Sequence, residues 1–366
     1  MKIVKVEAFP VALPLKKPFA IALGTMTHSP HAVVRITTDA GIIGYGEAST
    51  WHVVYGYDQH GLVWAIDHYL GPAVIGLDVS DIEAILARMD SVLPKNLMAK
   101  AGVEIACQDA RAKALGVPLY QVLGGRVRNP VEAIEAIDIV PLEEAAEMAA
   151  RHLKNGFRYI KIKIGLDWKE DVERVRVVRE SVGPEIRIRV DGNQGYDRAS
   201  AMKACEAMER FDLQWIEQPL PDWDLEGLAM LAEALWTPIA VDESLYTIHD
   251  VYKVVKAKAA DVINIKVPKC GGISSSLKIA HAALSMGIPC FLGGCIETGV
   301  GAAAALQFGA CAPNLFQGVE LIGSSAFTID IITEPLVTDR GVFTLPQKPG
   351  IGVEVDEEKL KRYSGM

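Results

Sequence analysis

The hydrophobic positions of the first 50 residues mostly follow the two-residue repeat of β-strands. Three strand-like runs lie there, IVKVEAFPVAL, HAVVRITTDA and IIGYGEAS, and the TDAG between the last two is a hairpin signal. Residues 60–116 change to helical periodicity, in the stretches Leu62–Leu70, Ile82–Leu93 and Ala99–Leu115. Strands followed by helices predict an α+β domain over residues 1–125, which ends near Gly124-Gly125.

From about residue 130 the pattern alternates between short apolar runs and amphipathic stretches. The strand-like runs are VEAIEAIDI, YIKIKIG, IRIRVDG, LQWIEQP, PIAVDES, VINIKVP, PCFLGG and FQGVELIG. The amphipathic stretches include Leu142–Asn155, Trp168–Ser181, Arg198–Arg210 and Ile248–Lys256. Strands separated by helices predict an α/β fold, a (β/α)8-type barrel (a modified TIM barrel) over residues 126–330. Residues 331–366 look irregular, and we expect them to return to the N-terminal domain.

Composition narrows the possible partners. The net charge of the 366 residues is −9 and is spread without a basic stripe, so we expect no nucleic-acid partner. No stretch approaches the roughly 18 apolar residues of a membrane span, and the N-terminus lacks the apolar core of a signal peptide. The six cysteines show no CxxC spacing. We therefore expect a soluble, cytoplasmic protein with reduced cysteines.

The last polar residues of the barrel strands are Lys163, Asp191, Glu217, Asp242, Lys266 and Glu320, with Glu297 just beyond the seventh strand. The first five recur at near-equal intervals of about one βα unit. Catalytic groups of such barrels sit at the C-terminal ends of the strands. The recurring phase therefore predicts that these side chains converge on one mouth of the barrel.

Three of these residues form an all-carboxylate set on consecutive strands: Asp191, Glu217 and Asp242. Converging negative charges repel unless something positive lies between them. Oxygen ligands alone favour a hard divalent cation, Mg²⁺ first and Mn²⁺ second. Surface carboxylates without a ligand would explain one such residue better than three in phase.

The lysines flank this carboxylate set. Lys161 and Lys163 lie two residues apart in IKIKI, so both point to one face, and the isoleucines make that face the barrel interior. Lys266 lies across the barrel from Lys163. A lysine near a metal and a second ammonium has a lowered pKa and can act as a base. Two opposed lysines suit a 1,1-proton transfer, and one alone suits an elimination or a cycloisomerisation.

These motifs resemble the enolase superfamily and, within it, the muconate lactonizing enzyme (muconate cycloisomerase) subgroup. The matching sequences are KIK at 161–163, DGN at 191–193, EQP at 217–219, DES at 242–244 and KVPKCGG at 266–272. The resemblance covers essentially the whole chain. It implies that residues 1–125 form a capping domain whose loops near 18–30 and 50–57 close over the substrate.

The resemblance also implies residue roles. Asp191, Glu217 and Asp242 would bind the metal, and Lys163 and Lys266 would be the acid/base pair. Lys161, Glu320 and Glu297 would give electrostatic support, with the last two undecided between ligand and lysine-orienting roles. Asn193 and Glu243 would lie behind the metal ligands. Phe19, Met26, Trp51 and Tyr55 would set specificity, although each could equally serve packing.

The motifs do not agree on one reaction. PCFLGGCIETG lacks the histidine of the mandelate racemase branch, and VELIGSS lacks the Asp-x-Asp of dipeptide epimerases. VELIG resembles cycloisomerases, whereas INIKVPKCGG resembles epimerases and racemases. We expect an isomerase that abstracts the α-proton of a small carboxylate through a metal-stabilised enolate, of muconate cycloisomerase-like or amino-acid-derivative racemase/epimerase type.

Two alternative functions remain open. The first alternative is a lyase of the same superfamily, an acid or hydroxyproline dehydratase or an o-succinylbenzoate synthase-like enzyme. The second is a non-catalytic binding barrel, which would have lost at least one ligand or base, whereas every motif is present. A homo-oligomer of unspecified size is also expected.

Overall fold

The computed structural model describes residues 1–129 and 131–365. Pro130 and Met366, which belong to the predicted barrel domain and the predicted C-terminal segment, lie outside the described residues. Three antiparallel strands in the order β1-β2-β3 begin the chain: β1 (Ile3–Ile21), β2 (Gly24–Thr38) and β3 (Ile43–Ser49). The helices after them are α1 (His52–Tyr55), α2 (Gln59–Ala65), the π-helix η1 (Ile66–Leu70), α3 (Gly71–Val74), α4 (Ile82–Val92), α5 (Leu97–Ala114) and α6 (Leu119–Val122).

Helix α5 packs closely on β3 because small residues face each other. A Cβ atom at Gly44 would lie 2.1 Å from the carbonyl oxygen of Ala106, and one at Gly46 would lie 2.1 Å from that of Gly102. Glycine is therefore the only residue that permits this approach. The contact gives the N-terminal domain a sheet-on-helix core, as the order of strands and helices in the sequence indicates.

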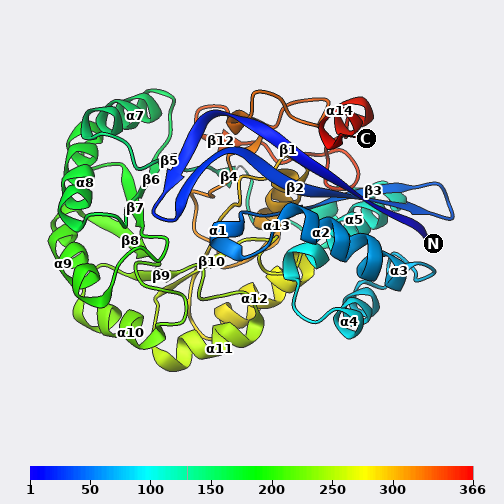
Figure 1. The fold of residues 1–366 in the computed structure, drawn as a ribbon, viewed down its shortest axis with the longest axis horizontal. Coiled ribbons are helices and arrows are strands. Elements are labelled where there is room, and N and C mark those ends of the chain that lie inside the picture. The colour runs from blue at the N-terminus through cyan, green and yellow to red at the C-terminus, as the bar shows by residue number, and fades with distance from the viewer. Residues whose placement is uncertain (130, 366) are drawn as a thin grey trace.

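The barrel is a parallel sheet of seven strands in the order β11-β10-β9-β8-β7-β6-β5. The strands are β5 (Glu135–Ile137), β6 (Tyr159–Lys163), β7 (Arg187–Asp191), β8 (Leu213–Glu217), β9 (Ile239–Val241), β10 (Val262–Ile265) and β11 (Cys290–Leu292). The helices that follow them are α7 (Leu142–Lys154), α8 (Trp168–Val182), α9 (Arg198–Met208) with the 3-10 turn η2 (Glu209–Phe211), α10 (Leu225–Ala234), α11 (Ile248–Ala257), α12 (Ile273–Ser285) and α13 (Gly299–Cys311). Figure 1 shows α7 to α12 in an arc outside the strands, which confirms the predicted barrel with a capping domain.

The eighth predicted strand, FQGVELIG, does not form a regular strand. Single backbone contacts hold it instead: the N–H of Glu320 donates to Leu292 (2.8 Å), and the N–H of Ile134 donates to Val319 (3.0 Å). Residues 314–320 thus bridge β11 and residues 132–134, and they occupy the eighth position of the ring. Gly318 has a φ of 80°, outside the strand region, which explains the break in the ladder.

Arg189 on β7 fastens this irregular segment from inside the barrel. Its guanidinium is fully buried, donates to the carbonyl oxygens of Gly318 (2.6 Å) and Gln317 (2.5 Å), and lies 3.9 Å from the ring centroid of Trp215. Burial lowers the pKa of Arg189 to about 10. A local sequence pattern cannot show this long-range hydrogen bonding, so the pattern of FQGVELIG alone predicts an ordinary strand.

We expect Arg189→Met to lower the free energy of unfolding by about 3 kcal/mol, because it leaves one buried and one partly buried carbonyl group without donors. Denaturant unfolding measures the effect. Arg187→Met, at an exposed position two residues earlier on the same strand, is the matched control. If both variants lost the same stability, Arg189 would not hold the eighth segment.

The C-terminal segment runs back to the N-terminal domain. The 3-10 turn η3 (Gly323–Ala326) is followed by β12 (Val342–Phe343), which pairs antiparallel with β4 (Val131–Glu132). Helix α14 (Glu357–Ser364) packs against β1, and Glu357 lies 2.8 Å from Arg35 on β2. Figure 1 shows α14 beside the N-terminal sheet. The domain limits given above remain a prediction.

Two further features concern the environment of the protein. All six cysteines are buried and unpaired. Across residues 1–129 and 131–365, no helix is both long enough and apolar enough to cross a membrane.

Candidate active site

The register of the parallel strands places the charged strand ends side by side. Lys163 is the cross-strand partner of Asp191, which is in turn the partner of Glu217. Asp242 follows β9 directly, and Lys266 follows β10. Parallel strands end at the same edge of a sheet, so the predicted convergence of these side chains is observed. The three carboxylates are fully buried.

Asp191 has its two oxygens in different environments. Oδ1 accepts a hydrogen bond from the backbone N–H of Asn193 (2.9 Å). Oδ2 lies 2.6 Å from Lys163 Nζ and 2.8 Å from Lys161 Nζ. One oxygen is therefore fixed by the following loop, and the other faces the lysines inside the barrel.

Glu217 shows the same division. Its Oε1 accepts from the side-chain amide of Asn264 on β10 (2.8 Å), and its Oε2 lies 2.8 Å from Lys161 Nζ. Lys161 also contacts Glu320, whose Oε2 lies 2.7 Å away. Lys161 Nζ is thus within ion-pair distance of three carboxylates, which explains how a buried ammonium is tolerated.

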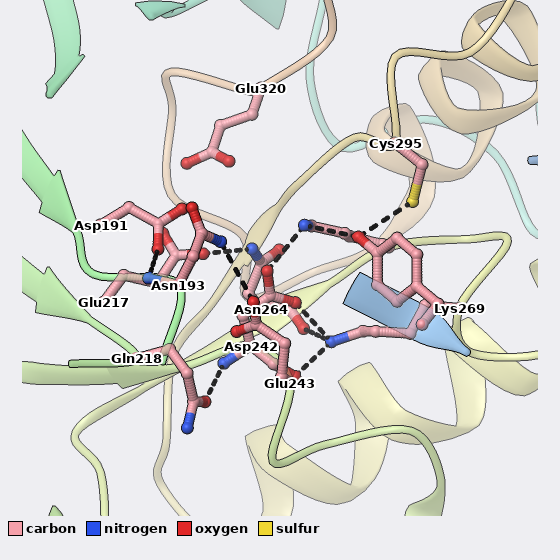
Figure 2. Close-up of polar contacts among 12 residues, drawn as sticks. Asp191, Asn193, Glu217, Gln218, Asp242, Glu243, Asn264, Lys269, Cys295 and Glu320 are labelled. Atoms are coloured by element: carbon pink, nitrogen blue, oxygen red, sulfur yellow. Dashed lines mark hydrogen bonds and ion pairs between the residues drawn. The ribbon is translucent and has the colours of Figure 1, made fainter. Parts of the chain in front are cut away.

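Asp242 completes the pattern. Its Oδ1 lies 2.7 Å from Lys269 Nζ and its Oδ2 lies 2.6 Å from Lys266 Nζ. Lys269 is fully buried and also donates to the backbone oxygen of Asp242 (2.5 Å) and to that of Asn264 (3.3 Å). Figure 2 shows Lys269 reaching this carboxylate from the side opposite Asp191.

Two lysines of the cluster, Lys161 and Lys266, carry raised pKa values. Burial lowers the pKa of Lys161 and of Lys266, but attraction to Asp191 and to Asp242, respectively, outweighs it and holds both well above the ordinary range. The lowered pKa expected from the sequence therefore needs an additional positive charge beside the lysines. A bound divalent cation supplies such a charge.

The carboxylates differ in their affinity for protons. Burial and repulsion by Asp191 raise the pKa of Glu217 well above its usual range. Burial also acts on Asp191, but attraction to Lys161 and Lys163 outweighs it and lowers the pKa to about 2. Repulsion between the neighbouring carboxylates therefore opposes ionisation of Glu217, as expected for crowded carboxylates.

The carboxylates of this cluster are the groups that could hold a divalent cation. Within the described residues, no group of three or more acidic, cysteine or histidine side chains is arranged to hold a metal ion. A lysine stands between the carboxylates and keeps them from forming such a group: Lys161 Nζ lies within ion-pair distance of both Asp191 and Glu217. Glu217 Oε2 and Asp242 Oδ2 accept no hydrogen bond and have only a lysine within ion-pair distance. The chemistry of the donor set thus fits a hard cation.

A pocket opens over this cluster. It lies between the barrel mouth and the N-terminal domain. Its lining includes the polar residues Lys161, Lys163, Lys266, Asn193 and Glu320, and the aromatic residues Phe19, Trp51 and Tyr55. The remaining lining side chains are mostly apolar, so the cavity is a largely apolar chamber with charged groups at one end.

Two of the residues expected at the site do not belong to the lining of this cavity. Among the described residues that line the cavity, neither Met26 nor Glu297 is found. Met26 packs in an apolar cluster with Ile21 and Trp51. The carboxylate of Glu297 accepts from the backbone N–H of Cys295 (2.8 Å).

Glu243 lies beside Asn193, the other residue expected behind the metal ligands. Its Oε1 accepts from the side-chain amide of Asn193 (3.1 Å), and both residues are buried. Asn193 in turn accepts from Lys163 Nζ (2.9 Å). The pair therefore lies behind Asp191 and Lys163, and burial together with repulsion by Asp242 raises the pKa of Glu243 to about 7.

Glu297→Gln should change how stability depends on pH. Burial raises the pKa of Glu297 to about 7, from 4.5. The folded state thus holds this proton more tightly, so its contribution is full below pH 4.5 and is lost as the pH rises through 7. We expect the variant to gain about 2 kcal/mol over the unaltered protein at pH 8 relative to pH 5, measured by denaturant unfolding. An equal difference at both pH values would contradict an ionisable buried Glu297.

Sequence reasoning missed two residues of the cluster, Asn264 and Lys269. Asn264 precedes Lys266 by two positions in INIK, so both side chains point to the same face of β10. That spacing was a usable signal. Lys269 lies in the loop after the strand, where no periodicity applies, and only its contacts with Asp242 show its place.

Comparison with known proteins decides the family. A family model described as "Mandelate racemase / muconate lactonizing enzyme, N-terminal domain" matches residues 3–124, and one described as "Enolase C-terminal domain-like" matches residues 143–359. The chain belongs to the enolase superfamily. Within that superfamily it falls in the muconate lactonizing enzyme subgroup, as the motifs indicated.

Relatives in this enolase-superfamily subgroup have different activities. An N-succinyl-L-Arg/Lys racemase of Bacillus cereus is 36% identical and covers 100% of this chain and 98% of its own. The structure of 2-chloromuconate cycloisomerase from Rhodococcus opacus is 33% identical, with a TM-score of 0.96 and 99% of each chain covered. The structure of a dipeptide epimerase from Enterococcus faecalis, complexed with Mg and the dipeptide L-Leu-L-Tyr, is 34% identical, with a TM-score of 0.93 over 97% of this chain and 100% of its own. The chain is an enzyme of this isomerase family.

Proposed function

We propose that the protein is a divalent-metal-dependent racemase or epimerase that moves the α-proton of a carboxylate substrate, an amino-acid derivative, from one face to the other. The observation that carries the proposal is the placement of Lys163 and Lys266. They end β6 and follow β10, which are separated by three strands of an eight-position ring, and both line the same cavity. A substrate carbon between them has an ammonium or amine group on each side.

The metal ligands that we propose are Asp191, Glu217 and Asp242, with Mg²⁺ preferred over Mn²⁺. A bound cation would polarise the substrate carboxylate and stabilise the negative charge that develops when the α-proton leaves. The three carboxylates lie on neighbouring strand ends and offer only oxygen. The Mg in the related dipeptide epimerase structure supports this choice.

The lysines of this chain carry the proton transfers. One of Lys163 and Lys266, as a neutral amine, takes the α-proton, and the other, as an ammonium, returns a proton to the opposite face. Lys161 stays charged beside them and stabilises the negative charge of the substrate carboxylate. Asn193, hydrogen-bonded to Lys163 Nζ (2.9 Å) and braced by Glu243, holds that lysine toward the cavity.

The apolar part of the cavity defines where the rest of the substrate lies. Phe19 and Trp51 from the N-terminal domain have ring centroids 6.2 Å apart and line one side. A small molecule with its carboxylate at the lysines would place its substituents against these rings. Specificity would then depend on Phe19, Trp51 and Tyr55, and not on Met26, which lies outside the lining.

The test is a substrate panel in D₂O with Mg²⁺: N-acyl amino acids, dipeptides, proline derivatives and muconates. Deuterium at the α-carbon together with racemisation would support the proposal. Lactone formation from a muconate without racemisation of any member would instead assign the chain to the cycloisomerases. Absence of α-exchange from all members would contradict racemisation and direct the search to hydroxylated acids and elimination.

A further inference from the structure

The two lysines have matching polar partners that come from different parts of the molecule. Lys163 Nζ contacts Asp191 Oδ2 (2.6 Å) and Asn193 Oδ1 (2.9 Å), both from the strand end and loop of β7. Lys266 Nζ contacts Asp242 Oδ2 (2.6 Å) and the hydroxyl oxygen of Tyr55 (3.0 Å). Each lysine thus has one carboxylate and one neutral partner.

The neutral partner of Lys266 belongs to the N-terminal domain. Tyr55 is the last residue of the short helix α1, which the left-handed Gly56 ends at a φ of 72°. The hydroxyl oxygen of Tyr55 also accepts from Cys295 Sγ (3.4 Å), in the segment after β11. The tyrosine of the N-terminal domain therefore contacts two segments of the barrel, one after β10 and one after β11.

We propose that Tyr55 is a positioning residue for Lys266, so that the N-terminal domain completes one of the two proton transfers while the barrel alone completes the other. The inference rests on the proposed two-lysine racemisation. A lysine has a long flexible stem, and a single carboxylate partner fixes its distance from Asp242 but not its direction. The hydroxyl of Tyr55 supplies the second contact that aims Nζ at the cavity.

The geometry gives an asymmetric expectation. Removal of the Tyr55 hydroxyl leaves Lys163 with both of its partners and Lys266 with Asp242 only. A residue that merely contacted substrate, or merely supported the fold, would affect both enantiomers alike. A positioning residue for Lys266 affects only the enantiomer whose α-proton Lys266 removes.

The experiment measures initial α-deuterium exchange from each pure enantiomer separately, using the N-acyl amino acid or dipeptide of the panel that exchanges fastest. Lys266→Ala first identifies the enantiomer that depends on Lys266. We expect Tyr55→Phe to slow exchange from that enantiomer about tenfold, the effect of one lost hydrogen bond, and to leave exchange from the other within about twofold. Tyr57→Phe, from the same loop, is the control and should change neither rate.

Each result decides the inference. Selective loss for the Lys266-dependent enantiomer, with KM unchanged, supports it. Equal loss for both enantiomers, loss for the other enantiomer, or no loss at all overturns it while leaving the proposed racemisation intact. Absence of exchange from either enantiomer with the unaltered protein would overturn both. Cys295→Ala, which removes the other partner of the hydroxyl, should produce a weaker loss with the same selectivity, and an unselective loss would count against the proposal.

Discussion

Alanine at Lys163 or at Lys266 is expected to reduce racemisation by about 10³-fold or more while the fold remains intact. Each lysine is the proton-transfer group on one side of the cavity, and general acid–base groups contribute about 10²- to 10⁴-fold to a rate. Racemisation needs both sides, so either single replacement is sufficient. Polarimetry or chiral chromatography measures the rate, and circular dichroism with thermal unfolding checks the fold.

The control for these variants is Lys169→Ala, which removes an exposed lysine of α8 outside the cavity. It should retain the full rate. If both Lys163→Ala and Lys266→Ala kept a rate near that of the unaltered protein, neither lysine would be a catalytic residue. The cluster would then have a purely structural role.

Asp242→Asn is expected to weaken Mg²⁺ binding by about 100-fold. The change removes one of three anionic ligands and leaves the buried Lys266 and Lys269 without their shared counterion. Replacement of groups that only support a ligand already costs about 10- to 100-fold in metal affinity. Calorimetric titration with Mg²⁺ measures the change, and unchanged affinity would contradict the ligand assignment.

Two further variants make the metal experiment decisive. Asp222→Asn removes a carboxylate from the loop after β8 and should leave Mg²⁺ affinity unaltered. Loss of the ion pairs with two buried lysines also threatens the fold of Asp242→Asn, since unpaired buried charges cost several kcal/mol. Glu217→Gln avoids this problem because Lys161 keeps Asp191 and Glu320 within ion-pair distance and Asn264 can still donate to Oε1. It should lose Mg²⁺ affinity as well.

The strand-end residues could be predicted from the sequence because a barrel repeats one geometry. Lys163, Asp191 and Glu217 are aligned by strand register, and a regular interval along the chain reports that register. The same logic places Lys161 and Lys163 on one face. Local periodicity was therefore sufficient to predict the charged cluster and the fold class.

Contacts between distant segments could not be predicted in this way. Nothing in the sequence around Tyr55 shows that its hydroxyl meets Lys266, and nothing in FQGVELIG shows that Arg189 binds its carbonyl groups. Glu297 was expected beside the lysines because it follows a strand, but its carboxylate accepts from the N–H of Cys295 instead. Side chains beyond strand ends follow the path of the loop, which periodicity does not specify.

The most direct test of the two-lysine account is the isotopic composition of the first product formed in D₂O from one pure enantiomer with Mg²⁺. Transfer between two lysines on opposite faces predicts that the inverted product carries deuterium from its first appearance, while recovered substrate carries little. Inverted product that retains the original α-hydrogen would show that one group removes and returns the same proton. That result would contradict the central claim that Lys163 and Lys266 act on opposite faces of the substrate.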